Sequence, residues 1–245
     1  NFTFREGLGN DRIRSIRELN GIMWFGTDGG GAARYDGKKF TTITQSDGLN
    51  SNLVHALGED AEGNLLLGNI MGGGGVRLYQ DDATDGNGKI VNRFSGSQLE
   101  FGPVLSIHTA SDGSIWTGFW GFGVIRYHNG ESMHLTINDG LPGTDVWSIT
   151  EAADGSIWLG TQSGAAKYNN GAISGRLTKQ EGLIVDFVPS IYTAPNGDIW
   201  FANSIWWYNQ LEGSGAVRYN EKATPKLKNY TVRTTKGGLA SDLVR

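Results

Sequence analysis

A short glycine-containing motif recurs along the chain at nearly constant intervals. It reads NGIMWFGT from Asn20, EGNLLLGN from Glu62, DGSIWTGF from Asp112, DGSIWLGT from Asp154 and NGDIWFAN from Asn196. The intervals between the shared glycines, Gly21, Gly63, Gly113, Gly155 and Gly197, are 42, 50, 42 and 42 residues. A repeat of this length restricts the chain to a few architectures in which each unit packs on its neighbours.

Each repeat holds four short apolar stretches separated by Gly, Asp and Asn turn signals. The first stretch follows an EGL, DGL or GGL landmark, which ends at Leu8, Leu49, Leu141, Leu183 and Leu239 and is degenerate at Leu99. No stretch has helical periodicity, so the density of turns excludes two-helix solenoids. The pattern predicts an all-β fold, a β-propeller of four-stranded antiparallel blades.

We predict a single propeller domain over residues 1–245, with five complete blades and partial strands of a sixth at the two ends. The units cover approximately 7–47, 48–97, 98–139, 140–181 and 182–237, and 238–245 opens a further unit. Two interpretations of the ends stay open: the chain is a segment of a longer propeller, or another chain completes it. Unpaired strand edges at both ends favour self-association.

The composition narrows the function classes. A net charge of −4 and a pI of about 5.6 argue against a nucleic-acid partner. The chain has no Cys, which excludes disulfides and thiolate metal sites. It has no apolar run long enough to span a bilayer, so we predict no membrane insertion.

The repeat resembles that of the two-component regulator propeller family, which forms sensor ectodomains of bacterial hybrid two-component systems. The resemblance rests on DGLNSNLVHALGEDAEGN (47–64), DGSIWLGT (154–161) and GGGAARYDGKKFTTIT (29–44). It implies a non-catalytic, extracytoplasmic propeller that recognises an oligosaccharide or similar polymer fragment as part of a sensor.

The positions that vary between units are the candidates for ligand binding. In a propeller, the loop from strand two to strand three and the connection into the next unit lie on one face. On this face or near the channel mouth we expect Trp206, Trp207, Tyr208, Trp120, Phe122, Trp147, Arg14, Arg17, His55 and Asp145. Indole rings stack on the apolar face of a pyranose, polar side chains bind its hydroxyls, and arginines also suit a carboxylate.

Alternative roles for these residues stay open. The aromatics of the loops could pack on an adjoining blade or form the interface of a protein assembly module. The tryptophans of the repeat itself, Trp24, Trp116, Trp158 and Trp200, are expected in the core. A third possibility is a polysaccharide or lactone lyase, because streptogramin-inactivating lyases carry comparable repeats. Against a lyase, no catalytic pair can be assigned among His55, His108 and the nearby carboxylates Glu100, Asp145 and Asp186.

No cofactor or metal is firmly predicted. The four histidines do not have the spacing of a zinc site. Asp85 and Asn87 are weak calcium candidates, because Ala83 stands at the first ligand position of that loop and the closing Glu is missing.

Overall fold

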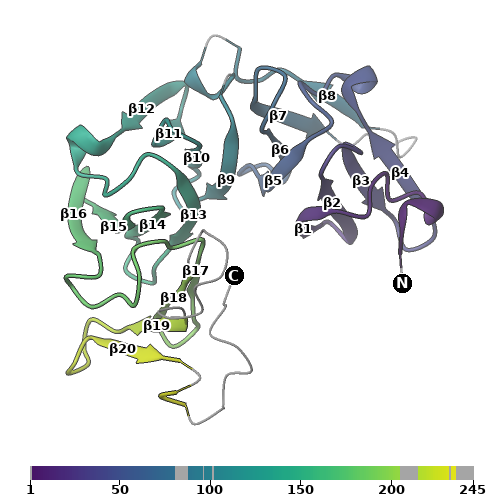
Figure 1. Ribbon diagram of the computed structural model, residues 1–245. Coiled ribbons are helices and arrows are strands. Elements are labelled where there is room, and N and C mark those ends of the chain that lie inside the picture. The colour runs from purple at the N-terminus through teal and green to yellow at the C-terminus, as the bar shows by residue number, and fades with distance from the viewer. Residues whose placement is uncertain are drawn as a thin grey trace. The chain divides into compact units, whose positions relative to one another are not determined.

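The computed structural model describes residues 2–80, 88–95, 97–100, 102–204, 215–231 and 233–235. The chain forms two compact units. The first runs to Trp120 and includes Ile125–His134, and the second comprises Gly121–Val124 and the chain from Leu135 onward. Within the described residues, twenty strands form five antiparallel sheets of four, which confirms the predicted blades (Figure 1).

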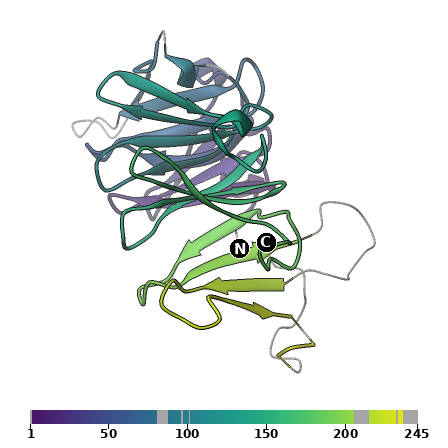
Figure 2. The ribbon, with the colours of Figure 1, turned by 90° about the vertical axis from the view of Figure 1, so that its left-hand side faces the viewer.

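In every sheet, the four strands are neighbours in the order in which they occur along the chain. The first three blades consist of β1 (Ile13–Leu19), β2 (Ile22–Thr27), β3 (Ala32–Tyr35) and β4 (Phe40–Ile43); β5 (Val54–Glu59), β6 (Leu65–Asn69), β7 (Gly75–Gln80) and β8 (Lys89–Val91); and β9 (Val104–Thr109), β10 (Ile115–Phe119), β11 (Val124–His128) and β12 (Glu131–Leu135). The fourth and fifth consist of β13 (Val146–Glu151), β14 (Ile157–Thr161), β15 (Gly164–Asn169) and β16 (Ala172–Leu177), and of β17 (Ser190–Thr193), β18 (Ile199–Asn203), β19 (Gly215–Tyr219) and β20 (Leu227–Tyr230). Figure 2 shows the last sheet in green to yellow.

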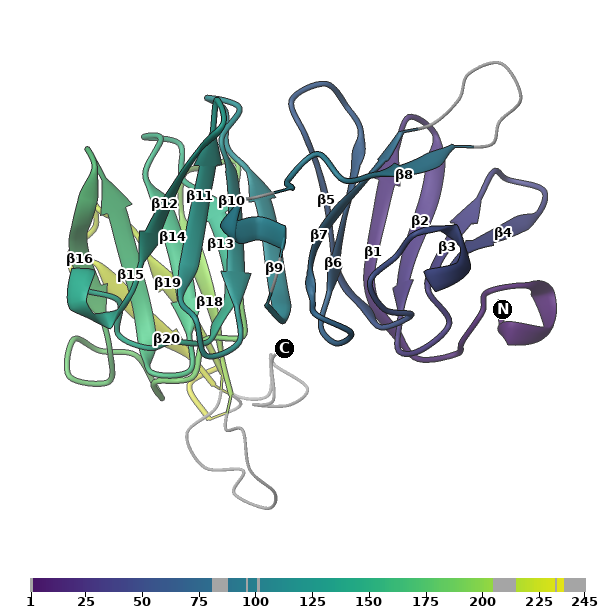
Figure 3. The ribbon, with the colours of Figure 1, turned by 90° about the horizontal axis from the view of Figure 1, so that it is seen from above.

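Neighbouring blades within each unit pack face to face. Blades one and two lie next to each other, with β5 beside β1 and β2 (Figure 3). They enclose a cluster in which Trp24 packs edge-to-face on Tyr79, with 4.9 Å between ring centroids. In the second unit, Trp158 packs edge-to-face on Phe201 at 5.3 Å and in a tilted arrangement on Tyr219 at 5.2 Å. The tryptophan of strand two is therefore the filling between one blade and the next.

The tryptophans of the repeat are not all equally buried. Trp24, Trp116 and Trp158 are at most 3% exposed, which confirms that they are core residues. Trp200 is only half-buried, and Tyr192, which pairs with it across β17 and β18, is 60% exposed. No further sheet follows this face among the described residues, so Trp200 has less to pack against.

A glycine near the end of strand two allows the next blade to approach. A Cβ on Gly26 would lie 2.7 Å from the Val54 carbonyl oxygen, and one on Gly160 would lie 2.6 Å from that of Val188. Both distances are shorter than a van der Waals contact, so a side chain at these positions would push the first strand of the next blade away.

The EGL and DGL landmarks form capped turns. In one of them, the Thr136 amide donates to Asp139 Oδ2 at 2.9 Å and the Asn138 amide donates to Thr136 Oγ1 at 3.2 Å, around the 3-10 turn Ile137–Asp139. Gly140 ends the turn with φ +109°, a conformation that favours glycine. The landmark is thus a local turn signal. The same capped turn spans Thr3–Gly7 and Thr44–Gly48, so Phe2, which precedes the first turn, is equivalent to Ile43, the last residue of β4.

Aspartates in the hairpins between strands one and two make the stability of the fold depend on pH. Burial raises the pKa of Asp112, but hydrogen bonds from Ser114 and Arg126 outweigh it and lower the pKa from 3.8 to about 2. For Asp154, bonds from Ser156 and Lys167 likewise outweigh burial and give a pKa of about 2. A carboxyl whose pKa is depressed in the folded state stabilises the fold above its unfolded pKa.

We therefore expect the melting temperature to fall as the pH drops from about 4 to about 2. Asp112→Asn and Asp154→Asn should each start from a lower melting temperature at neutral pH and lose less of it over this interval. Thermal melts followed by circular dichroism between pH 2 and pH 7 measure both effects. Equal losses in the wild type and the variants would contradict the prediction.

Candidate functional site

The loops between strands two and three lie beside the connection into the next blade. The amides of Gly29 and Gly31 donate to the Asn52 carbonyl at 3.1 and 2.8 Å, and the Gly102 amide donates to Gly73 at 2.9 Å. In the second unit, the Gly123 amide donates to the Thr144 carbonyl at 2.7 Å. Within each unit these bonds place both kinds of loop on the same face, as predicted, and we call it the loop face of that unit.

A β-bulge near the start of strand one explains the variable position after its apolar anchor. The register between strands one and two shifts between Ile13 and Ser15, and also between Val54 and Ala56 and between Val146 and Ser148. The extra residues are Arg14, His55 and Trp147. Bulges redirect a side chain away from the regular alternation of a strand. These three predicted residues therefore occupy equivalent bulges at the end of strand one that adjoins the loop face.

The third and fifth blades use this position differently. Leu105 occupies the bulge in β9 but is only 4% exposed, so in this blade the position belongs to the core. In the fifth blade the equivalent residue is Pro189, and β17 begins only at Ser190. The bulged position therefore carries a polar residue in two blades, an aromatic residue in one and a buried core residue in another.

In the first unit, charged groups gather around Asp28. Arg14 Nη2 donates to Asp28 Oδ2 at 2.6 Å, and Arg12 Nη1 lies 3.5 Å from the same oxygen. The backbone of Asp28 bridges to Leu53, just before the strand that carries His55. Burial, followed by the positive charge of Arg14, lowers the pKa of His55 and outweighs the opposite effect of Asp28. His55 is therefore neutral at pH 7.

Arg17, the other predicted arginine, lies three residues after Arg14 in β1. Arg17 pairs across β1 and β2 with the buried Trp24, and its Nε is 3.9 Å from Glu59. Its side chain is 31% exposed. Arg17 is thus separate from the Arg14–Asp28 pair at the loop face.

The β10–β11 loop carries two exposed aromatic side chains. Trp120 is 52% exposed and Phe122 is 44% exposed, whereas Phe119 directly before them is fully buried. The backbone of the loop is fixed, because the Trp120 amide donates to Pro103 at 2.9 Å and the Gly121 amide donates to Asp145 Oδ1 at 2.7 Å. Asp145 therefore holds the loop at the residue between the two aromatics.

Trp147 lies in the second unit and is half-buried. Its ring packs edge-to-face on Phe187, with 5.6 Å between centroids. Trp206, Trp207 and Tyr208, and the calcium candidates Asp85 and Asn87, lie outside the described residues. Their roles stay predictions.

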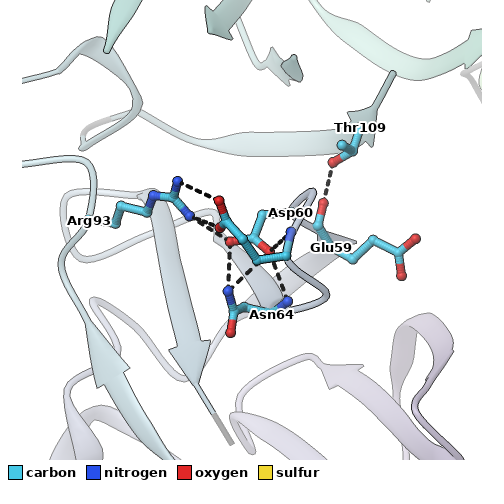
Figure 4. A network of polar contacts seen from close by, with 6 residues as sticks. Glu59, Asp60, Asn64, Arg93 and Thr109 are labelled. Atoms are coloured by element: carbon cyan, nitrogen blue, oxygen red, sulfur yellow. Dashed lines mark hydrogen bonds and ion pairs between the residues drawn. The ribbon is translucent and has the colours of Figure 1, made fainter. Parts of the chain in front are cut away.

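Grooves at the opposite ends of the blades are lined by groups that already pair with each other. One groove of about 360 Å³ lies beside Asp60, Glu62, Arg93 and Asp112. Arg93 Nη1 donates to Asp60 at 2.8 Å and also contacts Glu62, and Asn64 Nδ2 donates to Asp60 at 2.9 Å (Figure 4). We interpret this network as one that stabilises the hairpin turn between β5 and β6, and not as a ligand site.

Two sets of residues were not predicted from the sequence. Asp28 and Met71 lie in the loops between strands two and three, where Asp28 pairs with Arg12 and Arg14 and Met71 is 62% exposed. The basic residue of strand three was also missed. Arg126 and Lys167 each lie 6.0 Å from the tryptophan ring of their blade and pair with the hairpin aspartates. Their recurrence in GVIRY and GAAKY was the available signal.

Among the described residues, no group of three His, Asp or Glu side chains is placed to hold a metal ion, and no helix is long and apolar enough to cross a membrane. Two of the carboxylates considered for a lyase accept hydrogen bonds within the fold: Asp186 from the Lys179 amide at 2.6 Å and Glu100 from Asn92 at 2.9 Å.

Comparison with known proteins agrees with the repeat and the fold. The family model of the two-component regulator propeller matches residues 140–163, which confirms the resemblance seen in the sequence. No curated protein sequence matches the chain.

Several solved structures share the fold. The extracellular domain of a hybrid two-component system from B. thetaiotaomicron has a TM-score of 0.64 and 24% identity over 77% of this chain and 26% of its own. Virginiamycin B lyase from Staphylococcus aureus has a TM-score of 0.63 and 14% identity over 89% of this chain and 69% of its own. PorZ, a surface component of the type-IX secretion system of Porphyromonas gingivalis, has a TM-score of 0.63 and 14% identity over 95% of this chain and 35% of its own. The chain thus spans about a quarter of the first of these structures.

Proposed function

We propose that this propeller is an extracytoplasmic, non-catalytic sensor module that binds an oligosaccharide on its loop face. The observation that carries the proposal is the β10–β11 loop, where Trp120 and Phe122 are exposed on a fixed backbone. Exposed rings on a rigid loop lose little conformational entropy when a sugar stacks on them. The likeness to an extracellular sensor domain supports the sensor role and the location outside the cytoplasm.

A glycan array followed by calorimetry tests this function. We expect binding of at least one oligosaccharide, and Trp120→Ala should weaken it about tenfold or more, because the variant removes the stacking surface. Phe4→Ala is the matched control, since Phe4 is 58% exposed but lies in the turn before Leu8. An array without any bound glycan, or equal binding by the wild type and Trp120→Ala, would refute the proposal.

Two other functions are favoured by particular relatives. The likeness to PorZ favours an assembly module, in which the same aromatics, or open strand edges, bury a protein interface. Light scattering after size-exclusion chromatography would then show a complex that Trp120→Ala dissociates. The likeness to virginiamycin B lyase favours an elimination reaction. Ultraviolet absorbance of unsaturated products from uronate polymers or lactones would reveal that activity.

A further inference from the structure

Two arginines share a single carboxylate oxygen on the loop face of the first unit. Arg14 Nη2 is 2.6 Å from Asp28 Oδ2, and Arg12 Nη1 is 3.5 Å from that same oxygen. The shorter contact is a charge-assisted hydrogen bond, and the longer one is a loose ion pair. Asp28 therefore holds Arg14 in place and leaves Arg12 weakly restrained.

The fold positions these groups through the backbone. Arg14 is the bulged residue of β1. The Asp28 amide donates to the Arg12 carbonyl at 2.9 Å, and Asp28 bridges to Leu53 of the next blade. These main-chain bonds fix the backbone of Asp28 beside the backbone of Arg12, so the Asp28 carboxylate lies within reach of both arginines.

The charges around Asp28 do not balance. Two guanidinium groups face one carboxylate, and His55 adds no charge at pH 7 because burial and Arg14 lower its pKa. Arg17 has its own acidic partner in Glu59, at 3.9 Å. The group of Arg12, Arg14 and Asp28 thus carries an excess of one positive charge.

The excess charge is accessible from solvent. The side chains of Arg12 and Arg14 are 79% and 44% exposed, whereas that of Asp28 is only 17% exposed. Each guanidinium has five N–H donors, and Asp28 accepts from only a few of them. Donors on both arginines are therefore available to a ligand that approaches the loop face.

The glycine loop beside the arginines does not provide an alternative anion site. The Gly29 and Gly31 amides donate to Asn52, and the Gly30 amide donates to Thr27 Oγ1 at 3.0 Å. Because these amides are used within the fold, they cannot form a nest for an anion. A negative group bound here would depend on the arginine side chains.

We propose that Arg12 and Arg14 bind the carboxylate of an acidic sugar, so that the oligosaccharide recognised by this propeller contains uronic acid. The inference rests on the proposed function and specifies its ligand class. A planar carboxylate matches the fork of a guanidinium, and its single negative charge matches the single excess positive charge. A neutral oligosaccharide would form no ion pair with these arginines.

The test compares tetragalacturonic acid with its methyl ester, which has the same sugar scaffold without the charges. We expect the acid to bind about tenfold more tightly at low salt, and the difference to shrink as salt is added. Arg14→Gln should remove most of the difference, because it weakens binding of the acid far more than binding of the ester.

Lys38→Gln is the matched control for net charge, since Lys38 is exposed in the β3–β4 turn. It should leave the preference for the acid intact. Equal binding of acid and ester, or a preference that survives Arg14→Gln, would overturn the inference but not the proposed function. Binding of neither probe, together with Trp120-dependent binding of a neutral glycan, would also overturn the inference alone. An array on which no glycan binds overturns the proposed function and this inference together.

Discussion

Trp116→Ala is expected to lower the free energy of unfolding by about 3–5 kcal/mol. Trp116 is 1% exposed, and its indole Nε1 donates to Ser114 Oγ at 3.0 Å. Removing the ring opens a large cavity in a closely packed region and also removes the apolar support of Arg126, which lies 6.0 Å from the ring. Urea unfolding followed by tryptophan fluorescence and by circular dichroism measures the loss.

Trp120→Ala is the matched control, because it removes the same side chain four residues later. Trp120 is 52% exposed, so we expect its removal to change the free energy of unfolding by less than about 0.5 kcal/mol. Comparing the two variants distinguishes a tryptophan that the core needs from one that is exposed to a ligand. A similar loss from both substitutions would show that Trp120 is part of the packing, and would count against its proposed role.

Gly68→Ala is expected to cost about 1–3 kcal/mol, although it adds only one methyl group. A Cβ at Gly68 would lie 2.5 Å from Val104 Cγ1 and 3.1 Å from Ala56 Cβ. Both neighbours are buried, so the first strand of the third blade would have to move outward. Urea unfolding of the variant tests this cost.

Gly175→Ala provides the control in a strand with space for a methyl group. The nearest atom to a Cβ there is Lys167 Cβ at 3.8 Å, so we expect a change of less than about 0.5 kcal/mol. In a double-mutant cycle, Val104→Ala should offset part of the cost of Gly68→Ala, because it removes the clashing methyl group. Additive losses would show that the cost comes from another contact.

The repeat predicted the fold because each blade repeats the same local chemistry. The capped turn at Thr136–Gly140 and the buried Trp24, Trp116 and Trp158 all stand where the repeated motifs suggested. Trp200 is the exception, and its partial exposure depends on what packs next to its sheet. Local motifs specify a strand and its face, but not how fully a neighbour covers that face.

The candidate site was predictable only in part. The exposure of Trp120 and Phe122 follows from their place in a loop that departs from the other units. The burial of Leu105 did not follow from its position, because a bulge can turn a side chain toward the core or toward solvent. The role of Asp145 was also hidden, since it serves the backbone of a loop 24 residues earlier in the chain.

The sequence by itself determined that this chain forms four-stranded antiparallel blades and that tight turns divide their strands. These properties depend on turn residues and on side chains that alternate along a strand, both of which are local. Only the tertiary structure decided that Arg12, Arg14, Asp28 and His55 meet. They come from two blades, and the bulges and the stacking of sheets bring them together. The physical reason is that charge complementarity acts through space, across distances that the order of residues does not record.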